Sequence, residues 1–480
     1  MSAENLLTKA FSASELTASQ ETGPNTPLPD APAFPEQEAA SPESLSPAAP
    51  AEPGALAASP ESGSPTGLAD NQYAGTLKIS VVSSIGLIPV DNAVVTVSYT
   101  GDPETPLNVL TTDSSGQTPV IELAAPPLEL SLNPDADRQP YSEYNISVTA
   151  DGYEPVYVSG SEILANELSL QIIRMNPLAS TEEDEKVVFI PAHTLWGEYP
   201  PKIPEDEIKP MAETGEIVLS RVVIPEYVIV HDGAPGDPSA PNYWVRYRDY
   251  IKNVASCEIY STWPESAIYA NVLAIQSFTL NRVYTEWYRN QGYNFTITSS
   301  TAYDQKWIYG RNIYKNIDYL VDTIFANYLS RPGVRQPIFT SYCDGNRVTC
   351  NGLSQWGSKY LGDQGYSAIE IIRYYYGNDM YINTAEIISG VPSSWPGYDL
   401  SVGASGDKVR QLQTQLNRIA RNYPAIPTVT ADGIYGPRTA DAVRVFQGIF
   451  NLPQTGVTDY PTWYEISEIY VGVSRIAEPG

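Results

Sequence analysis

Cysteine, histidine and basic residues are all scarce in this chain of 480 residues. Three cysteines and two histidines leave little material for metal chemistry, and an odd number of thiols leaves at least one unpaired within the chain. Lys and Arg number 28 against 56 acidic residues, for a formal net charge of −28. A nucleic-acid binder carries a basic stripe, and none is visible here. The sequence therefore predicts no nucleic-acid partner.

Long apolar runs are also missing. No stretch reaches the roughly 18 apolar residues that a membrane-spanning helix needs, so we expect no membrane span. The N-terminus, "MSAENLLTKAFSASELTAS", lacks an apolar core behind a basic start, so no secretory signal peptide is readable. Three explanations stay open: the start is truncated, the protein leaves by another route, or it stays inside.

Tyrosine, by contrast, is abundant, with 34 residues against nine phenylalanines. Amphipathic rings in such excess are typical of wet, ring-stacking surfaces such as carbohydrate clefts, and also of sheet faces.

The first half of the chain divides by composition. Residues 1–73 are rich in Pro, Ala, Ser and Glu and have too little apolar content to offset chain entropy, which predicts a disordered tail. Residues 74–178 contain short alternating strands such as "TLKISVVSS" and "AVVTVSYTG", which predict an all-β sandwich. Their "TTDSSG" and "VTADGY" segments resemble the carboxypeptidase-regulatory-like, transthyretin-type sandwich, a family of spacers or binders. Residues 179–217 are acidic and Pro-rich and indicate a linker.

Residues 218–385 carry the longest informative motifs. "TWPESAIYANVLAIQSFTLN" predicts a mostly buried helix with Thr262, Pro264 and Glu265 at its start, and the preceding "DYIKNVASCE" predicts a strand that ends at Glu258. Together with "AYDQKWIYGR" and "SYCDGNRVTCNGLSQWG", these segments resemble the catalytic domain of the stage II sporulation protein D / amidase-enhancer family. The resemblance implies an α+β fold. Active members of that family are lytic transglycosylases that cut the glycan strands of peptidoglycan.

The resemblance puts the catalytic carboxyl group at Glu258. Such a group first protonates the glycosidic oxygen and then takes a proton from the sugar's own 6-hydroxyl, so a second carboxylate is not required. Apolar neighbours, here Ile259, Tyr260 and Trp263, are expected to raise its pKa so that it serves as acid and then base. The structural alternative is a Glu258 that merely caps a helix or forms a salt bridge.

Other residues of these motifs are candidates for holding the substrate: Trp263, Asp304, Gln305, Gln355 and Trp356. We expect Trp356 to be exposed or half-buried, where its ring either stacks on a sugar or anchors the core. Asp304 and Gln305 either bond sugar hydroxyls or brace the loop that carries Glu258.

Two cysteines, Cys343 and Cys350, bracket a polar loop before "SQWG". Some members of the resembled family hold zinc with Cys and His beside the catalytic Glu, but the family's "G-H-G" is missing here. We rank a disulfide or a reduced structural pair first, and zinc second, with Cys257, Cys343, Cys350 and either Asp344 or water as ligands. A cysteine nucleophile ranks last because no His lies nearby in sequence. The preferred prediction is no cofactor.

Residues 397–475 predict three helices. Two apolar stripes have helical spacing, and Asp459 or Thr458 caps a third helix; the stripes are Val409, Leu412, Leu416 and Ile419, then Ala440, Val443, Phe446 and Phe450. The blocks "DGIYGPRT", "AVRVFQ" and "TWYEI" resemble the three-helix peptidoglycan-binding domain. Candidates for its ligand groove are Asp432, Gly433, Tyr435, Gly436 and Arg438.

These resemblances imply a protein of the cell envelope or spore whose partner is the glycan strand of peptidoglycan. Two classes of function remain. The chain is either a lytic transglycosylase that uses Glu258, or a non-catalytic wall-binding protein that presents or modulates another cell-wall hydrolase.

Overall fold

The computed structural model describes residues 73–178, 186–209 and 221–474. Apart from Tyr73, the predicted disordered tail lies outside the described residues, as do parts of the predicted linker. The chain is multidomain, with a β-rich first part and a helical C-terminal part, and the described residues belong to one compact unit. Within the described ranges, no helix combines the length and the apolar character that a membrane crossing requires.

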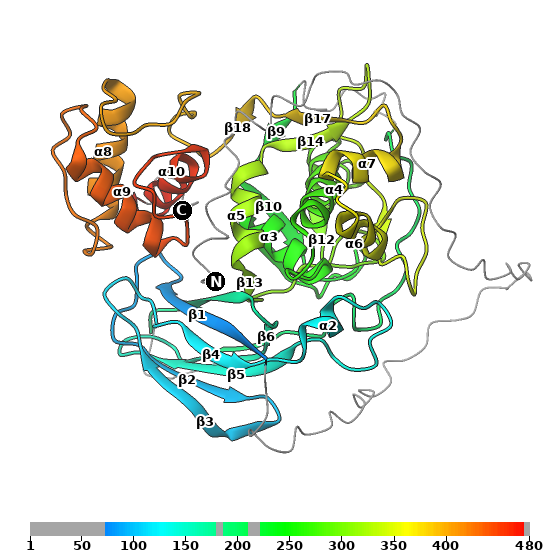
Figure 1. The fold of residues 1–480 in the computed structure, drawn as a ribbon, viewed down its shortest axis with the longest axis horizontal. Helices are drawn as coiled ribbons and strands as arrows, with labels where there is room; N and C mark the ends of the chain where they lie inside the picture. Colours follow the sequence, from blue (N-terminus) through cyan, green and yellow to red (C-terminus); the bar gives the residue numbers. More distant parts are fainter. Residues whose placement is uncertain (1–72, 179–185, 210–220, 475–480) are drawn as a thin grey trace, which may run out of the picture. The chain divides into compact units, whose positions relative to one another are not determined.

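The β-rich region, residues 74–175, is built from alternating strands. Leu77, Ile79 and Val81 of β1 are fully buried, and Val95 and Val97 of β2 enter the same core. This period of two is what a strand imposes on a half-buried sequence. The elements are β1 (Ala74–Ser83), β2 (Val94–Tyr99), β3 (Asp102–Thr111), β4 (Ile121–Ala124), α2 (Leu128–Ser131), β5 (Ser142–Thr149), β6 (Val156–Ile163) and β7 (Leu168–Met175), drawn in blue and cyan in Figure 1.

Two sheets form this region, in the orders β3-β2-β5-β6-β8 and β13-β7-β1-β4. Two of these strands come from elsewhere in the sequence. Strand β8 (Lys186–Phe189) pairs in parallel with β6, and β13 (Ile313–Tyr314) pairs antiparallel with β7. The linker prediction is therefore wrong for Lys186–Phe189, because this segment completes a sheet and buries Val188 in its core.

A buried ion pair joins the β-rich region to the central region. The two terminal nitrogens of Arg311 donate to the two carboxylate oxygens of Glu162, at 2.9 and 2.6 Å. Next to them, Asn312 accepts from the backbone N–H of Glu162 at 3.0 Å and donates to its carbonyl oxygen at 2.9 Å. Both charged side chains are almost fully buried. Bidentate geometry suits such a pair, and losing either partner would leave the other charge buried alone.

Helices dominate the central region, residues 223–388. Its helices are α3 (Tyr247–Glu258), α4 (Glu265–Tyr284), α5 (Lys315–Ile324), α6 (Gln355–Asp363) and α7 (Ala368–Tyr376), with a short 3₁₀ turn η3 (Arg289–Gln291). Its further strands are β9 (Val223–Ile224), β10 (Tyr227–His231), β11 (Asn242–Arg246), β12 (Ile297–Thr298), β14 (Asn327–Ser330), β15 (Tyr342–Cys343), β16 (Leu353–Ser354), β17 (Tyr381–Thr384) and β18 (Ile387–Ile388).

The strand predicted for "DYIKNVASCE" is wrong, because this segment is helix α3. Tyr247, Tyr250, Ile251 and Val254 follow the spacing of one helical face and are all buried. Nearly every other residue of α3 is buried as well. Polar residues such as Arg248, Asp249, Lys252 and Asn253 fall between these apolar positions, so the helical spacing is present in the sequence and the strand prediction overlooked it.

Helix α4 confirms the buried helix that the sequence predicts, since nearly all of its residues are enclosed. It begins at Glu265, directly after Pro264. Thr262 does not act as its cap. The Thr262 hydroxyl instead donates to the Ser131 hydroxyl of the β-rich region, at 2.9 Å.

The C-terminal helical region contains the three predicted helices, α8 (Asp407–Ile419), α9 (Pro437–Ile449) and α10 (Tyr460–Ser474), drawn in orange and red in Figure 1. Both predicted stripes face its core, and Val409, Leu412 and Val443 are fully buried. The Asp459 carboxylate accepts from the N–H of Thr462 at 3.0 Å, as expected of a cap.

We expect the Glu162→Gln substitution to lower the free energy of unfolding by about 3 to 5 kcal/mol, because it leaves the buried Arg311 without its counter-charge. Urea denaturation followed by circular dichroism measures this change. Glu122→Gln, an exposed position on β4, is the matched control and should change stability by less than about 0.5 kcal/mol. Equal stability of the two variants would contradict the role given to the pair.

Candidate functional site

Glu258 is the last residue of α3, and its side chain is held by donors from outside that helix. It is 5% exposed. Its carboxylate accepts from the backbone N–H of Lys306 (2.9 Å), the hydroxyl of Tyr342 (3.5 Å) and Nε2 of Gln355 (3.2 Å). A carboxylate at a helix C-terminus faces carbonyl dipoles, so it needs such donors.

The three donors come from the two other sequence motifs of the central region. Lys306 belongs to "AYDQKWIYGR", while Tyr342 and Gln355 lie in "SYCDGNRVTCNGLSQWG". The structure thus brings Glu258 and Gln355, two of the predicted site residues, into direct contact. The expected surroundings differ, however. Ile259, Tyr260 and Trp263 are buried in the core, and the contacts of the carboxylate itself are polar.

Local geometry fixes the position of Gln355 at the start of α6. The Ser354 hydroxyl accepts from the N–H of Gly357 at 2.9 Å and so caps this helix. Gly345 packs against the same hydroxyl with a φ of +77°, and a Cβ at this position would lie 1.8 Å from the Ser354 Oγ. Only glycine meets both requirements without displacing the cap.

The loop before α6 is closed by a disulfide between Cys343 and Cys350, which confirms the first-ranked alternative. Arg347 at its tip donates to the backbone carbonyl oxygens of Thr194 (2.9 Å) and Trp196 (2.9 Å). These residues belong to the segment predicted as a linker. The loop therefore ties that segment to the side of the central region that carries Glu258.

The structure does not bring together the three cysteines of the second-ranked alternative, a zinc site. Cys343 and Cys350 are bonded to each other, and Cys257 lies in the core shared with the β-rich region. Burial raises the pKa of the Cys257 thiol to about 12, so it stays protonated rather than becoming a thiolate ligand. Across the described ranges, no group of three or more His, Cys, Asp or Glu side chains is placed to hold a metal ion.

The two tryptophans predicted to touch substrate are core residues. Trp263 and Trp356 are 4% and 8% exposed, and their rings pack with centroids 4.9 Å apart. The Trp263 Nε1–H donates to the carbonyl oxygen of Ser131 at 3.0 Å. The expectation that Trp356 is exposed or half-buried is therefore wrong. Its position after a helix start suggested solvent, but tertiary packing encloses it.

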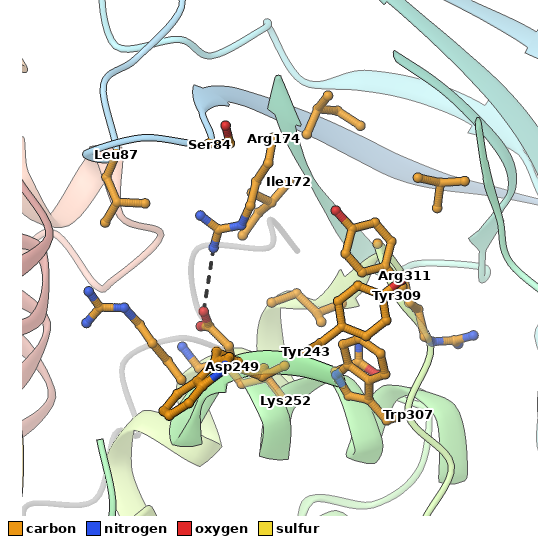
Figure 2. Close-up of a pocket in the computed structure, with 18 of the residues that line it drawn as sticks. Ser84, Leu87, Ile172, Arg174, Tyr243, Asp249, Lys252, Trp307, Tyr309 and Arg311 are labelled. Atoms are coloured by element: carbon orange, nitrogen blue, oxygen red, sulfur yellow. Dashed lines mark ion pairs between the residues drawn. The ribbon is translucent and has the colours of Figure 1, made fainter. Parts of the chain in front are cut away.

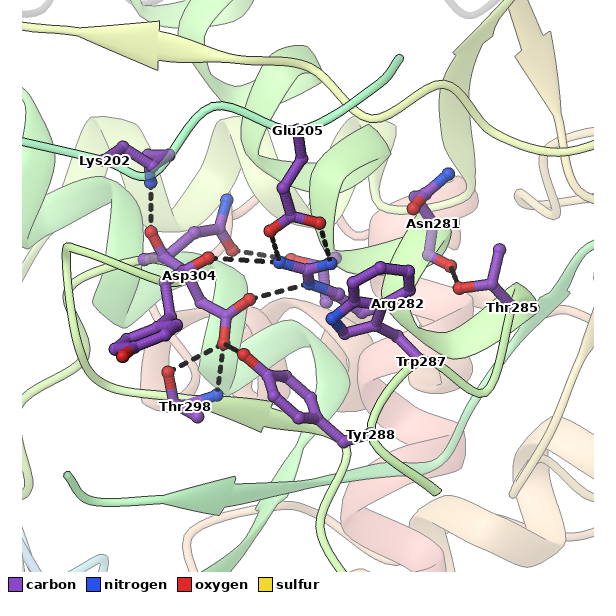
Figure 3. Close-up of polar contacts among 12 residues, drawn as sticks. Lys202, Glu205, Asn281, Arg282, Thr285, Trp287, Tyr288, Thr298 and Asp304 are labelled. Carbon is purple, nitrogen blue, oxygen red and sulfur yellow. Dashed lines mark hydrogen bonds and ion pairs between the residues drawn. The ribbon is translucent and has the colours of Figure 1, made fainter. Parts of the chain in front are cut away.

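Asp304 and Gln305 are fully buried and use their polar atoms inside the protein. Figure 3 shows Asp304 between Arg282, Tyr288 and Thr298, with the Arg282 Nε 2.7 Å and the Tyr288 hydroxyl 2.6 Å from its carboxylate. Gln305 accepts from the hydroxyls of Tyr250 (3.2 Å) and Thr279 (2.8 Å). Both brace the loop that presents the Lys306 N–H, which is the second of the two roles considered for them.

Three residues that sequence reasoning missed lie in the predicted linker. Glu205 bonds Arg282 through two oxygens (Figure 3). Lys202 donates to the Asp304 carbonyl oxygen. Burial lowers the pKa of Lys202, while the nearby Glu258 and Asp304 charges oppose that shift. His193 stacks on Tyr260 at 4.4 Å between centroids, and burial lowers the His193 pKa well below its ordinary value. No local motif signals these contacts.

A cavity in the described part of the chain lies apart from Glu258. It has a volume of about 410 Å³ and is lined by residues of the β-rich region, β8, β10, β11, α3, the segment 307–313 and α10 (Figure 2). Glu258 is not among its lining residues. From Asn253, which does line it, α3 continues five residues to Glu258, or roughly 7.5 Å along the helix axis.

The C-terminal groove candidates divide between surface and core. Tyr435 is fully buried and donates to the Gly456 carbonyl oxygen at 2.9 Å, so it packs inside the region. Asp432 is exposed, and its carboxylate accepts from the Ile434 N–H at 2.9 Å, which, with a second bond from Gln413, lowers its pKa. Arg438 is exposed. Ile434 lies in the same turn and was not predicted as a site residue. Its apolar side chain is 59% exposed.

This turn and the three helices are the part of the chain that matches a known protein family. Residues 405–466 match a family model described as "Putative peptidoglycan binding domain". The chain carries a peptidoglycan-binding domain. The match covers the whole of α8 and α9 and the first part of α10. It does not extend to the central or β-rich regions, so their family resemblances stay predictions.

No curated protein matches the chain. Among solved structures, the Bacillus anthracis TIE protein matches at 15% identity over 22% of this chain and 17% of that protein, with a TM-score of 0.15. The match thus spans less than a fifth of the TIE protein's length. A likeness at this level carries no argument about fold or function.

We expect oxidised protein to yield a cross-linked Cys343–Cys350 peptide in mass spectrometry, and its melting temperature to be unchanged by EDTA. Replacing both cysteines with serine should lower the free energy of unfolding by about 2 kcal/mol, the loop-closure entropy of so short a loop. Cys257→Ser is the control for the cross-link and leaves it intact. Stoichiometric zinc in elemental analysis, lost together with folding on chelation, would contradict the prediction.

Proposed function

We propose that this chain is a cell-envelope protein that binds peptidoglycan through its C-terminal domain and cleaves glycan strands through its central region. In this proposal the central region is a lytic transglycosylase with Glu258 as its single acid and base. The observation that carries it is that three sequence motifs meet at one carboxylate. One motif contains Glu258, and the other two supply the donors Lys306, Tyr342 and Gln355.

The proposed reaction needs one carboxyl group and no external nucleophile. Glu258 donates its proton to the glycosidic oxygen as the bond from that oxygen to the anomeric carbon breaks. The carboxylate then accepts the proton of the same sugar's 6-hydroxyl, whose oxygen bonds to the anomeric carbon. One product therefore ends in a 1,6-anhydro sugar, and the other gains a free hydroxyl.

The surrounding donors support the positioning that this chemistry demands. The Lys306 N–H belongs to a loop braced by the buried Asp304, and Gln355 is set by the capped start of α6. The hydrogen bonds from Lys306 and Gln355 fix the Glu258 carboxylate against rigid elements, so its orientation does not depend on a mobile side chain.

A second candidate function rests on the burial of Glu258. At 5% exposure, and with three donors already bonded to it, the carboxylate has little contact with solvent. A substrate that approaches it would compete with these donors for the carboxylate oxygens. The alternative is therefore a wall-binding protein whose central region presents or modulates another hydrolase.

We expect the Glu258→Gln substitution to reduce glycan cleavage by about 10² to 10⁴ or more, because it removes the transferable proton while keeping the shape of the side chain. Mass spectrometry of products from purified glycan strands measures the loss. Wild-type products should carry anhydro ends. Glu265→Gln, an exposed carboxylate seven residues further on, is the control and should keep wild-type activity.

Two outcomes would reject this mechanism. Products with only ordinary reducing ends would mark a hydrolase. Equal inertness of wild type and Glu258→Gln on every glycan, with both proteins folded by circular dichroism, would favour the wall-binding alternative.

We expect residues 397–475, expressed alone, to be retained on purified peptidoglycan sacculi, since every block of the three-helix pattern is present. In the full chain, Ile434→Ser should weaken retention, because Ile434 is an exposed apolar side chain whose N–H bonds the groove candidate Asp432. Val109→Ser on β3, similarly exposed, is the control. Co-sedimentation measures both. Recovery of the segment equal to that of an unrelated acidic domain would exclude the binding role.

A further inference from the structure

The cavity of about 410 Å³ has a lining that differs in charge from the rest of the chain. Five basic residues line it, against the single carboxylate of Asp249, in a protein whose formal net charge is −28. The basic residues are Arg174, Lys186, Arg246, Lys252 and Arg311. Its volume lies within the range of about 300 to 1,000 Å³ that small-molecule sites occupy. The cavity is thus suited in size and sign to a small anionic ligand.

Most of these cations already have carboxylate partners. Arg311 pairs with Glu162, Lys252 with Asp318 and Asp322, Arg246 with Glu468, and Arg174 with Asp249. Lys186 is the exception, because no carboxylate in the described part of the chain pairs with it. Its ammonium group bonds the Tyr309 hydroxyl and lies 4.7 Å from the centre of that ring. Among the described residues, Lys186 is therefore the cation of the lining that is left to pair with an anionic group in the cavity.

A second group in the wall lacks a partner. Arg311 lines the cavity and is 5% exposed, yet its Nε–H has no hydrogen-bond acceptor among the described residues. A buried donor without an acceptor costs free energy, so such groups in native proteins usually mark a missing water, ion or ligand.

Aromatic rings form the side of the cavity where Lys186 lies. Tyr243 packs on Tyr309 with centroids 4.8 Å apart and on Trp307 at 5.4 Å. Figure 2 shows these three rings together, with Arg174 reaching from β7 toward Asp249 on the other side. Tyr243 and Tyr309 are partly exposed, and both line the cavity. Rings with polar edges stack on the C–H faces of sugars and bond their hydroxyls.

We propose that this cavity is a saccharide site, separate from Glu258, that takes a sugar ring bearing a carboxylate. The ring packs on Tyr243 and Tyr309, and the carboxylate pairs with Lys186. Two sources offer this chemistry, the lactyl group of a muramic-acid residue and a uronic acid. Binding in this cavity requires no cleavage, so the proposal does not depend on whether Glu258 is catalytic.

Occupancy of the cavity is linked to Glu258 through one short segment. Asn253 clamps this segment by donating to the Ile308 carbonyl oxygen (2.8 Å) and accepting from the Ile308 N–H (3.0 Å). Trp307 and Tyr309 on either side line the cavity, and the preceding Lys306 donates to Glu258. A ligand packed on these rings restrains the loop that positions the Glu258 carboxylate.

Ligand-observed saturation-transfer NMR on the full chain tests the proposal, with N-acetylmuramic acid, glucuronic acid and neutral N-acetylglucosamine as probes. We expect one or both acids to bind with a Kd on the order of 1 mM, and N-acetylglucosamine at least about tenfold more weakly. Preference for one acid over the other identifies the source. Binding should weaken as NaCl is raised, because the ion pair is partly exposed.

Two cavity variants and one control separate this site from any other. Lys186→Gln should weaken binding of the acids about tenfold or more, and Tyr309→Leu should weaken it while keeping the charge. Lys359→Gln, which removes an equal charge from an ion pair on α6, should change nothing. Unchanged melting temperatures and unchanged circular dichroism spectra show that each variant is folded. Equal binding of neutral and acidic probes, or acid binding that is insensitive to both Lys186→Gln and Tyr309→Leu, would overturn the proposal.

Discussion

The burial of helix α3 is the constraint on which the rest of the structure depends. Apart from Asp249, every residue of this helix is enclosed, including Arg248, Lys252 and Glu258. Buried charged or polar groups are tolerated only when they are paired or hydrogen-bonded, so each of these side chains needs a partner from another element. Arg248 finds Glu465 and Glu468 on α10, and Lys252 finds Asp318 and Asp322 on α5; Glu258 finds Lys306, Tyr342 and Gln355. One helix thereby joins the peptidoglycan-binding domain, the central helices and the candidate site.

The same constraint explains why segments distant in sequence meet near Glu258. Its donors are themselves held by further buried contacts, Lys306 by the Asp304 network and Gln355 by Ser354 and Gly345. The segment from residue 186 to 209 adds a strand to the β-rich region, an ion pair to Arg282 and a cation beside Glu258. A stretch that composition marks as a linker is thus part of the folded structure.

Several features were predictable because they rest on local patterns. The three C-terminal helices follow from their stripes and turn residues, and α4 from its apolar run after Pro264. Strands β1 and β2 follow from alternation. Helix α3 was predicted as a strand although Tyr247, Tyr250, Ile251 and Val254 have helical spacing, so a local pattern was present and was misinterpreted. Trp356 and Tyr435 were expected near ligands, but both fill the core, since motif residues at helix starts and turns serve packing as readily as binding.

By itself, the sequence determined the order of regions, the peptidoglycan-binding domain and the position of one candidate carboxylate at Glu258, because each of these is encoded in residues close together along the chain. Only the tertiary structure decided what surrounds that carboxylate, that Cys343 bonds Cys350 while Cys257 stays apart, and that a basic, ring-lined cavity forms between β7, α3 and the segment 307–313. These features depend on contacts between residues separated by tens to hundreds of positions, or, for the disulfide, on the actual fold of its loop. Burial and pairing there follow from how the elements pack, which no local pattern records.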